Sequence, residues 1–231
     1  MHSGTWHDAV CVNLDGQAPP LAQHLAPVLK QAEDFDIPQF DYARTVEGAF
    51  DPNWKLTIEN WSDVYHVFAV HPTLNEIMDA PARAGMSTDR NLIYGRWGYD
   101  AEMLEAEPLP IAQNLIGQAR TAFFMGHLFP ALCISFHPGM FLLWDHKPLS
   151  HEKTQAKLHI YAAGGAAMDP AYQQHLQDRA QCYIALNAED DEVCHLMQRG
   201  RRAYGHDGGR FAPYWNKGTL HLAQLVTNAA G

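Results

Sequence analysis

The sequence predicts an α+β fold in which an antiparallel sheet packs against a long C-terminal helix. Two stretches of alternating apolar and polar residues, 131–137 and 140–145, are joined by a Pro-Gly pair, which is typical of a β-hairpin. Further along, Asp169 stands directly before Pro170, a capping carboxylate followed by the residue best suited to a first helical position. The 231 residues suffice for one domain with a sizeable core.

In chain order, the N-terminal half is expected to form a short strand, an amphipathic helix and an extended segment. We expect these elements at residues 9–14, 21–32 and 45–50. Residues 55–70 carry apolar side chains at helical spacing and are predicted to form one helix. Residues 76–89 are polar and interrupted by glycine and proline, so we expect a loop there.

In the C-terminal half, strands are predicted at residues 91–99 and 153–163, before and after the hairpin. Residues 111–120 are expected to be irregular or helical. The helix that begins at the Asp-Pro pair is predicted to end near residue 186. A second helix with an acidic first turn is predicted over residues 189–202.

Composition excludes several classes of function. The formal net charge of −10 argues against binding nucleic acid, whose phosphates require basic patches. No apolar run approaches the ~20 residues that span a bilayer, and no signal-peptide pattern is present, so we expect no membrane segment and a cytoplasmic location. The four cysteines have no disulfide or zinc-finger spacing. They are Cys11, Cys133, Cys182 and Cys194.

The most informative motif is Asp63 followed by His66 and then His71-Pro72. Two histidines and one carboxylate form the ligand set of non-heme iron(II) oxygenases, which leaves metal positions open. Zinc is the first rival, because paired histidines suit zinc equally well. In a chain with 14 histidines, a pair at this spacing also arises easily by chance.

The spacing of the two histidines restricts how they can share an ion. Five positions on a regular helix correspond to a rotation of roughly 140°, which points the two rings apart. Pro72 disfavours the helical conformation at His71, so the helix is expected to end there and let His71 turn back toward His66. Asp63, three residues before His66, can accept a hydrogen bond from that imidazole and fix its orientation.

Residues along most of the chain match one known pattern. They are Trp6 with Val12-Asn13-Leu14-Asp15 and Ala18-Pro19-Pro20-Leu21; Asn53-Trp54-Lys55, Glu59-Asn60, Asp63-x-Tyr65-His66 and His71; and Glu189-Asp190, Val193-Cys194 and Gln198-Arg199-Gly200. This pattern resembles the catalytic domain of the Rieske-type non-heme iron oxygenase large subunit. That ring-hydroxylating family also includes choline- and carnitine-type monooxygenases. The resemblance implies the START-like, helix-grip version of the α+β fold, with sheet and helix enclosing an apolar substrate cavity.

The resemblance also implies the ligands of the metal. His66 and His71 would bind Fe(2+), and Asp190 would be the third ligand because it follows a glutamate and precedes a cysteine by four residues. Asp191 and Glu192 remain rivals for that position. For these two, the other interpretation is a solvated acidic start of a helix, where carboxylates favour the positive end of the helix dipole.

The resemblance implies two candidate catalytic residues and a reaction. Asp63 would connect the iron to the [2Fe-2S] Rieske cluster of a neighbouring subunit, and Asn60 would lie beside the iron. The enzyme would use O2 and externally supplied electrons to hydroxylate, dihydroxylate or dealkylate a small organic substrate, either aromatic or a quaternary amine. A homo-oligomer is implied, a trimer in the family.

The sequence departs from the family in lacking the Rieske motif. A Rieske cluster needs two cysteines and two histidines, closely paired in sequence, and none of the four cysteines begins a Cys-x-His or Cys-x-x-His pair. We therefore expect residues 1–231 to be a single catalytic domain and residues 1–23 a remnant of the linker from a missing Rieske domain. The chain would be a separate subunit or a truncated product, supplied with electrons by a Rieske protein or reductase.

Two other functions remain open. One is a non-catalytic START-like ligand-binding or assembly subunit. The other is a zinc hydrolase, against which the absence of a His-Glu-x-x-His motif argues. Six aromatic residues on the predicted strands are candidates either for a substrate pocket or for plain core. They are Trp97, Phe123, Phe124, Phe136, Phe141 and Trp144.

Overall fold

The computed structural model describes residues 1–35, 37–50, 52–72, 74, 85–99 and 101–230. Its main sheet has seven strands, all antiparallel to their neighbours. They are β3 (Phe40–Phe50), β4 (Ser87–Asp89), β5 (Leu92–Gly98), β6 (Ala122–Leu128), β7 (Leu132–Phe136), β8 (Met140–Ser150) and β9 (Lys153–Ala163). The spatial order is β3-β9-β8-β7-β6-β5-β4, so the first strand pairs with the last and the rest form a meander.

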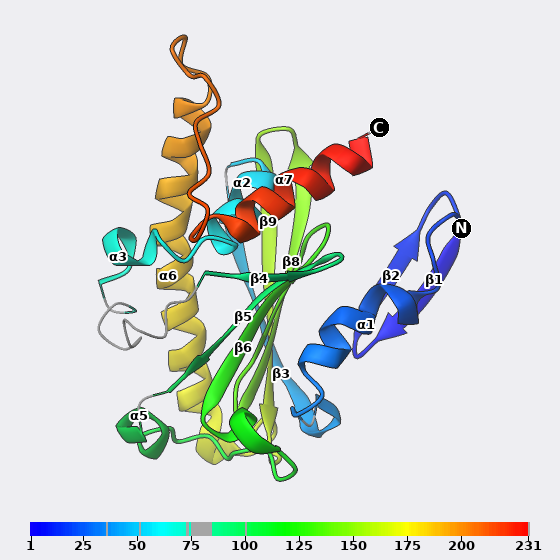
Figure 1. Cartoon of the computed structure of the whole chain (residues 1–231). Helices are drawn as coiled ribbons and strands as arrows, with labels where there is room; N and C mark the ends of the chain where they lie inside the picture. The colour runs from blue at the N-terminus through cyan, green and yellow to red at the C-terminus, as the bar shows by residue number, and fades with distance from the viewer. Residues whose placement is uncertain (36, 51, 73, 75–84, 100, 231) are drawn as a thin grey trace.

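Helices lie on both faces of this sheet (Figure 1). They are α1 (Leu21–Gln31), α2 (Trp54–Trp61), α3 (Val67–Val70), α5 (Ala101–Glu105), α6 (Gln173–Gly200) and α7 (Lys217–Ala230). Helix α6 runs the length of the molecule, and α7 packs against α2, β4 and β5 (Figure 1). A separate hairpin of β1 (His2–Trp6) and β2 (Ala9–Asn13) stands away from the sheet beside α1 (Figure 1).

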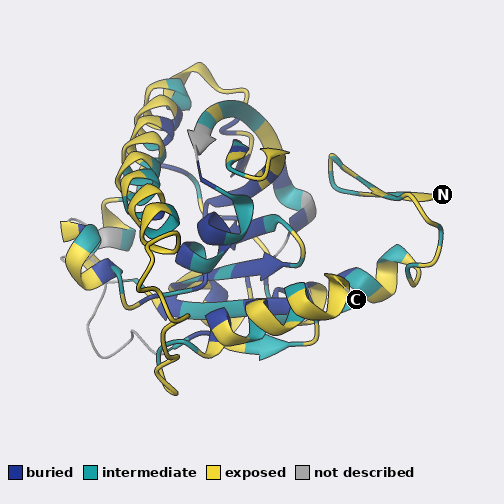
Figure 2. Ribbon diagram, turned by 90° about the horizontal axis from the view of Figure 1, so that it is seen from above, coloured by how far each residue is buried: buried dark blue, intermediate teal, exposed yellow. Residues whose placement is uncertain are grey.

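Both faces of the sheet are buried, and successive strand residues alternate between two cores. One core lies under α1 and includes Phe124, Phe136 and Phe141. The other lies under α2, α6 and α7 and includes Trp97 and Trp144. Figure 2 shows the resulting pattern, with the inward side of α6 buried or of intermediate exposure and its outward side exposed. The α+β fold and the long helix packed on the sheet confirm the fold class predicted from the sequence.

Two helix predictions were wrong. Residues 55–70 do not form one helix, because α2 ends at Trp61 and the chain resumes as the short α3. The side chain of Asp63 accepts the backbone N–H of His66 at 3.0 Å, a local bond that competes with helix continuation. The second helix expected over residues 189–202 does not exist separately, because α6 continues through residues 173–200 without a break.

The strand and loop predictions had mixed results. The hairpin over residues 131–145 and the strand at 153–163 were confirmed. The loop predicted at residues 76–89 lies largely outside the described residues, but its end, Ser87–Asp89, is strand β4 instead. Strands β1 and β6 and helix α7 were not predicted.

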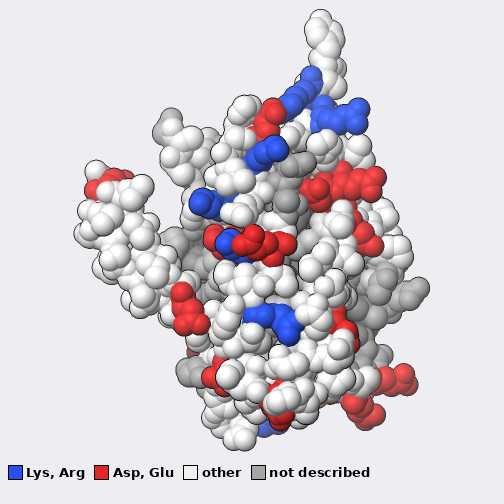
Figure 3. Space-filling view, turned by 180° about the vertical axis from the view of Figure 1, so that it is seen from behind, with Lys and Arg blue, Asp and Glu red and all other residues white. Residues whose placement is uncertain are grey.

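Among the described residues, no helix has both the length and the apolar composition needed to cross a membrane. The charged side chains on the rear face of the molecule are also mixed in sign. Figure 3 shows Lys and Arg interleaved with Asp and Glu there, with no broad basic patch on the part of that face that is described.

Candidate metal centre

Three elements bring the predicted ligand residues together. His66 immediately precedes α3, His71 immediately follows it, and Asp190 lies in the C-terminal half of α6. The Nε2 atom of His71 lies 2.9 Å from Asp190 Oδ1, and the Nε2 atom of His66 lies 3.5 Å from the same oxygen. One ligand atom from each of the three residues lies within 4.8 Å of the others, the one such group within the described part of the chain.

The other nitrogen of each imidazole faces a carboxylate. His66 Nδ1 lies 3.3 Å from Asp63 Oδ2, and His71 Nδ1 lies 2.7 Å from Glu189 Oε2. Each ring is thereby oriented so that its Nε2 atom points toward Asp190. Metal-binding histidines commonly have this arrangement, in which a carboxylate fixes the tautomer and raises ligand basicity. The contact of Asp63 was expected from the sequence, whereas that of Glu189 was not.

Two amides complete the polar network. Asn60 Nδ2, at the end of α2, donates to Asp190 Oδ1 at 2.7 Å. Asn216 Nδ2, just before α7, donates to Asp63 Oδ1 at 3.2 Å. Asn60 was singled out from the sequence and does reach the site. Asn216 was missed, because it is 153 positions from Asp63 in the sequence and no local pattern marks it.

The charges of these groups are strongly coupled. Burial alone would lower the pKa of His66, but its hydrogen bonds to Asp190 and Asp63 raise it to about 9. The pKa of His71 is raised in the same way, against burial, by Asp190 and Glu189. Burial would raise the pKa of Asp190, but the two imidazoles hold it at about 2. Without a metal, the raised pKa values favour protonated imidazoles at the position where a cation could bind.

The arrangement fits a divalent metal ion. Two imidazole nitrogens and one carboxylate oxygen converge from the same side, and each imidazole is held by a second carboxylate. Asp191, a rival for the third position, instead lines a groove on β3 that also contains Glu47 and Ile184. One residue along a helix is a rotation of roughly 100°, so Asp191 faces away from the histidines. The role of the triad as metal ligands stays a prediction.

Metal binding is expected to release protons. His66 is largely protonated at pH 7 when its pKa is about 9, and a metal ion must displace that proton from the ligand nitrogen. We expect release of at least about one proton per ferrous ion at pH 7, and affinity that rises as the pH approaches about 9. Anaerobic calorimetry in buffers of different protonation enthalpy measures this number.

The same shift has a consequence for stability. Because the folded-state pKa of His66 lies above its ordinary value of 6.5, its ion pairs stabilise the metal-free chain fully below pH 6.5. That contribution is lost as the pH rises through about 9.

His159→Gln is a matched control for the calorimetry that measures proton release, because burial lowers the pKa of His159 and it lies away from the triad. Binding without proton release would contradict a protonated His66 in the metal-free chain.

The triad opens into a cavity of about 240 Å³ between α6 and the sheet. Of the six aromatic residues considered above, Trp97, Phe123 and Trp144 line this cavity. The remaining three, Phe124, Phe136 and Phe141, belong to the core on the opposite face of the sheet. Alternation along each strand accounts for the division, as between Phe123 and Phe124, which are neighbours on β6 and face opposite sides of the sheet.

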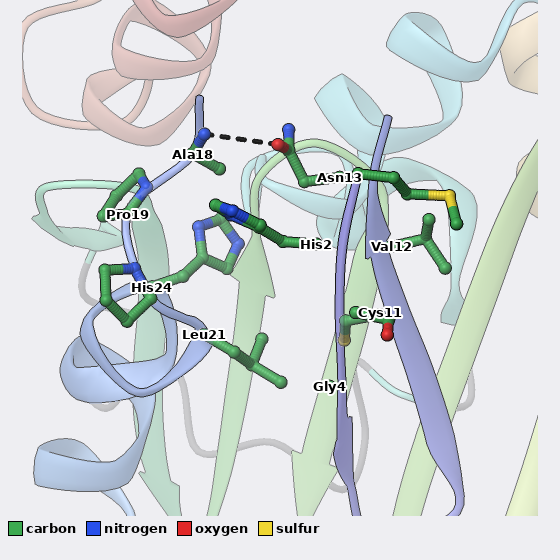
Figure 4. A pocket seen from close by; sticks show the side chains of 12 residues that line it. His2, Gly4, Cys11, Val12, Asn13, Ala18, Pro19, Leu21 and His24 are labelled. Atoms are coloured by element: carbon green, nitrogen blue, oxygen red, sulfur yellow. Dashed lines mark hydrogen bonds between the residues drawn. The ribbon is translucent and has the colours of Figure 1, made fainter. Parts of the chain in front are cut away.

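A second hollow lies far from this site, between the β1–β2 hairpin and α1 (Figure 4). It has a volume of about 660 Å³ and an open form, and the side chains of His2, Cys11 and His24 are among those that line it. Its walls carry no carboxylate. The hydrogen bond drawn in Figure 4, from the backbone N–H of Ala18 to Asn13 Oδ1 at 3.3 Å, fixes the turn after the hairpin. Its two histidines and one cysteine do not converge into a metal site, since among the described residues only the triad of His66, His71 and Asp190 does so.

The structure combines an antiparallel sheet covered by helices with two histidines and an aspartate beside an apolar cavity. This combination is the one expected of the oxygenase family that the sequence resembles. Residues 30–229 match the family model of the ring hydroxylating alpha subunit, catalytic domain. The chain belongs to this family. Comparison with curated proteins found no significant sequence match.

Solved structures of Rieske oxygenases share the fold. A quaternary ammonium Rieske monooxygenase in complex with L-carnitine superimposes with a TM-score of 0.75 at 17% identity, over 98% of this chain and 60% of that one. Naphthalene 1,2-dioxygenase from Rhodococcus sp. bound to indole gives a TM-score of 0.62 at 18% identity, over 98% of this chain and 65% of that one. The chain thus spans about three fifths of the length of the first of these structures.

Proposed function

We propose that this chain is the catalytic part of a mononuclear non-heme iron oxygenase, with His66, His71 and Asp190 as the ligands of Fe(2+). The observation that carries the proposal is the convergence of these three side chains, each histidine held by its own carboxylate, at the end of an apolar cavity. Membership of the ring hydroxylating alpha subunit family supports it. Bound ferrous iron would supply the activation of O2.

The protein's own residues would hold the reactants and exclude side reactions. Asp63 and Glu189 keep the two imidazoles oriented, and Asn60 fixes the carboxylate of Asp190 by hydrogen bonding to one of its oxygens. The aromatic walls of the cavity would position a small organic substrate, aromatic or a quaternary amine, and keep bulk water away. Hydroxylation, dihydroxylation or dealkylation of that substrate would follow.

The electrons for this reaction would come from outside residues 1–231. No cysteine of the sequence begins the Cys-x-His or Cys-x-x-His pair that a Rieske cluster requires. We propose a [2Fe-2S] Rieske protein, with its reductase, as the donor, a homo-oligomer as the assembly, and the cytoplasm as the location. Residues 1–231 would act as one catalytic domain, with residues 1–23 as the segment that in relatives joins the Rieske domain.

The proposal is tested by the dependence of turnover on an added donor. The iron-loaded chain with NADH or NADPH and a reductase alone is expected to give no sustained substrate oxidation. Addition of a Rieske protein should start oxygen consumption coupled to product. Hydrogen peroxide with the ferrous form should give limited product without the donor, because it supplies oxygen and electrons together.

Two controls separate the rival functions. Metal analysis after expression in medium with both metals distinguishes iron from the zinc of a hydrolase. Absence of product under every condition, with iron fully bound, would favour the non-catalytic subunit. Sustained turnover without any Rieske protein would contradict the proposed external donor.

A further inference from the structure

The cavity beside the triad is elongated along α6. The residues of this helix that line it are Arg179, Cys182, Tyr183, Leu186, Asn187 and Asp190. Their spacing is that of one helix face, since residues three, four, seven, eight and eleven positions apart lie in a single stripe. Asp190 is eleven residues beyond Arg179, so the two ends of the stripe are separated by roughly 16 Å along the helix axis. The metal triad is at one end and the guanidinium of Arg179 at the other.

The walls between these ends suit a flat apolar body. Trp97 and Phe123 lie on the sheet side, with ring centroids 5.5 Å apart. Trp144 meets Tyr183 of α6 edge to face at 5.7 Å. Aromatic surfaces of this kind bind either planar apolar molecules or quaternary ammonium groups. The charge at the far end of the cavity distinguishes the two.

Arg179 forms an ion pair with Glu107, but only the guanidinium partner lines the cavity. Its Nη2 donates to Glu107 Oε2 at 2.5 Å, and the other oxygen of Glu107 accepts the backbone N–H of Leu109 at 3.3 Å. Arg179 lines the cavity, whereas Glu107 is not among the described residues that do. No further hydrogen bond of the guanidinium is made within the described residues, so Nε and Nη1 remain as donors.

The cavity-lining polar groups nearest Arg179 are neutral, in contrast to its partner Glu107. Ser135 Oγ donates to the carbonyl oxygen of Phe124 at 3.1 Å and lies 2.7 Å from His137 Nε2, so His137 donates there. His137 Nδ1 is then the acceptor for the hydroxyl of Tyr99. Burial, with a smaller effect of the nearby Arg179 charge, lowers the pKa of His137 to about 3. A cationic end group would therefore approach the guanidinium side of the Arg179–Glu107 pair, and an anionic end group would meet N–H donors there.

We propose that the cavity takes an elongated, planar apolar substrate that ends in a carboxylate, and that Arg179 binds this carboxylate while the opposite end of the substrate lies at the triad. This inference deepens the proposed function and rests on it for the part that concerns the metal. Of the two substrate classes proposed above, it favours an aromatic or similarly flat molecule with an anionic end over a quaternary amine. Arg179 would then set specificity through a charge-assisted hydrogen bond at a distance from the reacting carbon.

The test uses three probes with one body and different end groups: biphenyl-4-carboxylate, its neutral isostere biphenyl-4-carboxamide, and biphenyl-4-yltrimethylammonium. Binding to the metal-free chain is followed by calorimetry and by quenching of tryptophan fluorescence. We expect the carboxylate to bind at least about tenfold more tightly than the amide, as for a hydrogen bond to a charged group. The ammonium compound should bind most weakly.

Variants assign the effect to Arg179. Arg179→Gln should remove the preference for the carboxylate over the amide. Glu107→Gln should strengthen carboxylate binding, because it removes the competing anion and keeps an acceptor for Leu109. Arg44→Gln is the matched control, since Arg44 bonds Gln173 and Gln177 on the same helix outside the cavity and should leave all three affinities unchanged.

Several outcomes would overturn the inference. They are equal binding of carboxylate and amide, tighter binding of the ammonium compound, no binding of any probe, or an Arg179→Gln variant that is folded by circular dichroism and keeps the preference. If Arg179→Gln does not fold, weaker or unchanged carboxylate binding in Glu107→Gln decides against it. Because no metal is needed, carboxylate binding without iron binding would refute the proposed oxygenase and leave this inference standing.

Discussion

Alanine at His66, His71 or Asp190 is expected to reduce bound iron from about one ion per chain to nearly none. Each of these residues supplies one of the three converging ligand atoms, and removal of one leaves too few protein ligands for a stable site. The measurement is elemental analysis after anaerobic loading with ferrous ion and removal of the excess. The loss should be much larger than the 10- to 100-fold weakening typical of a residue that only orients a ligand.

Asp191→Ala is the matched control. It removes a carboxylate from the neighbouring position of the same helix, on a side that faces β3 and not the histidines. It should leave iron content unchanged. Full iron retention in Asp190→Ala together with loss in Asp191→Ala would move the third ligand to Asp191. Thermal unfolding of each variant checks that a lost ion does not reflect a lost fold, since His71 is buried and loses a partner in Asp190→Ala.

The proximity of Asp63, His66 and His71 was predictable because the three residues are close in sequence. Asp63, His66 and His71 lie within nine residues, and a proline after the second histidine marks the point where the chain turns. The hairpin over residues 131–145 was predictable for a similar reason, since alternation and a turn pair are read from adjacent residues. Features of this kind depend on few long-range contacts.

The break between α2 and α3 was not predictable from periodicity. Apolar residues continue at helical spacing through the break, and two of them, Val64 and Val67, are buried. What interrupts the helix is a side-chain bond from Asp63 to the backbone of His66, which a pattern of apolar residues does not reveal. The break turns both histidines toward Asp190, a geometry that an unbroken helix could not provide.

The prediction of two helices in place of α6 was wrong because a local sequence pattern was taken as a helix start. Glu189 and Asp190 have the composition of an acidic first turn, which predicts a new helix. In the structure they lie well inside a helix of 28 residues, and their carboxylates face His71 and His66 instead of capping backbone N–H groups. These acidic residues therefore mark contacts with the two histidines and not the start of a new helix. Asn216 and Arg179 contribute to the centre and the cavity only through tertiary packing.

The position of Asp63 supports its predicted role between the centre and an external donor. Asn60, Asp63 and His66 line both the inner cavity and an outer groove of about 540 Å³ beside α2, α6 and α7. Asp63 also contacts His66 directly and is held from the other side by Asn216. Its carboxylate thus connects the outer groove directly with His66, the histidine predicted to bind the metal.

Asp63→Asn is expected to keep most of the iron and to abolish turnover driven by a reduced Rieske protein. Asparagine keeps the size of the side chain and an oxygen that can accept the backbone N–H of His66, so the turn before α3 should persist. The negative charge beside His66 is lost. Donor-driven oxidation of substrate should fall by more than the 10- to 100-fold expected of a residue that only orients a ligand, whereas product formed with peroxide should be largely retained.

Glu189→Gln provides the comparison that separates the two roles of Asp63. Glu189 holds Nδ1 of His71 as Asp63 holds Nδ1 of His66, but it does not line the outer groove. If both carboxylates only orient imidazoles, the two variants should lose iron affinity and both kinds of turnover to a similar extent. If Asp63 carries the route from the donor, only Asp63→Asn should lose donor-driven turnover selectively. Normal donor-driven turnover in Asp63→Asn rules out that route, and loss of iron as severe as in His66→Ala makes Asp63 a ligand or a structural residue instead.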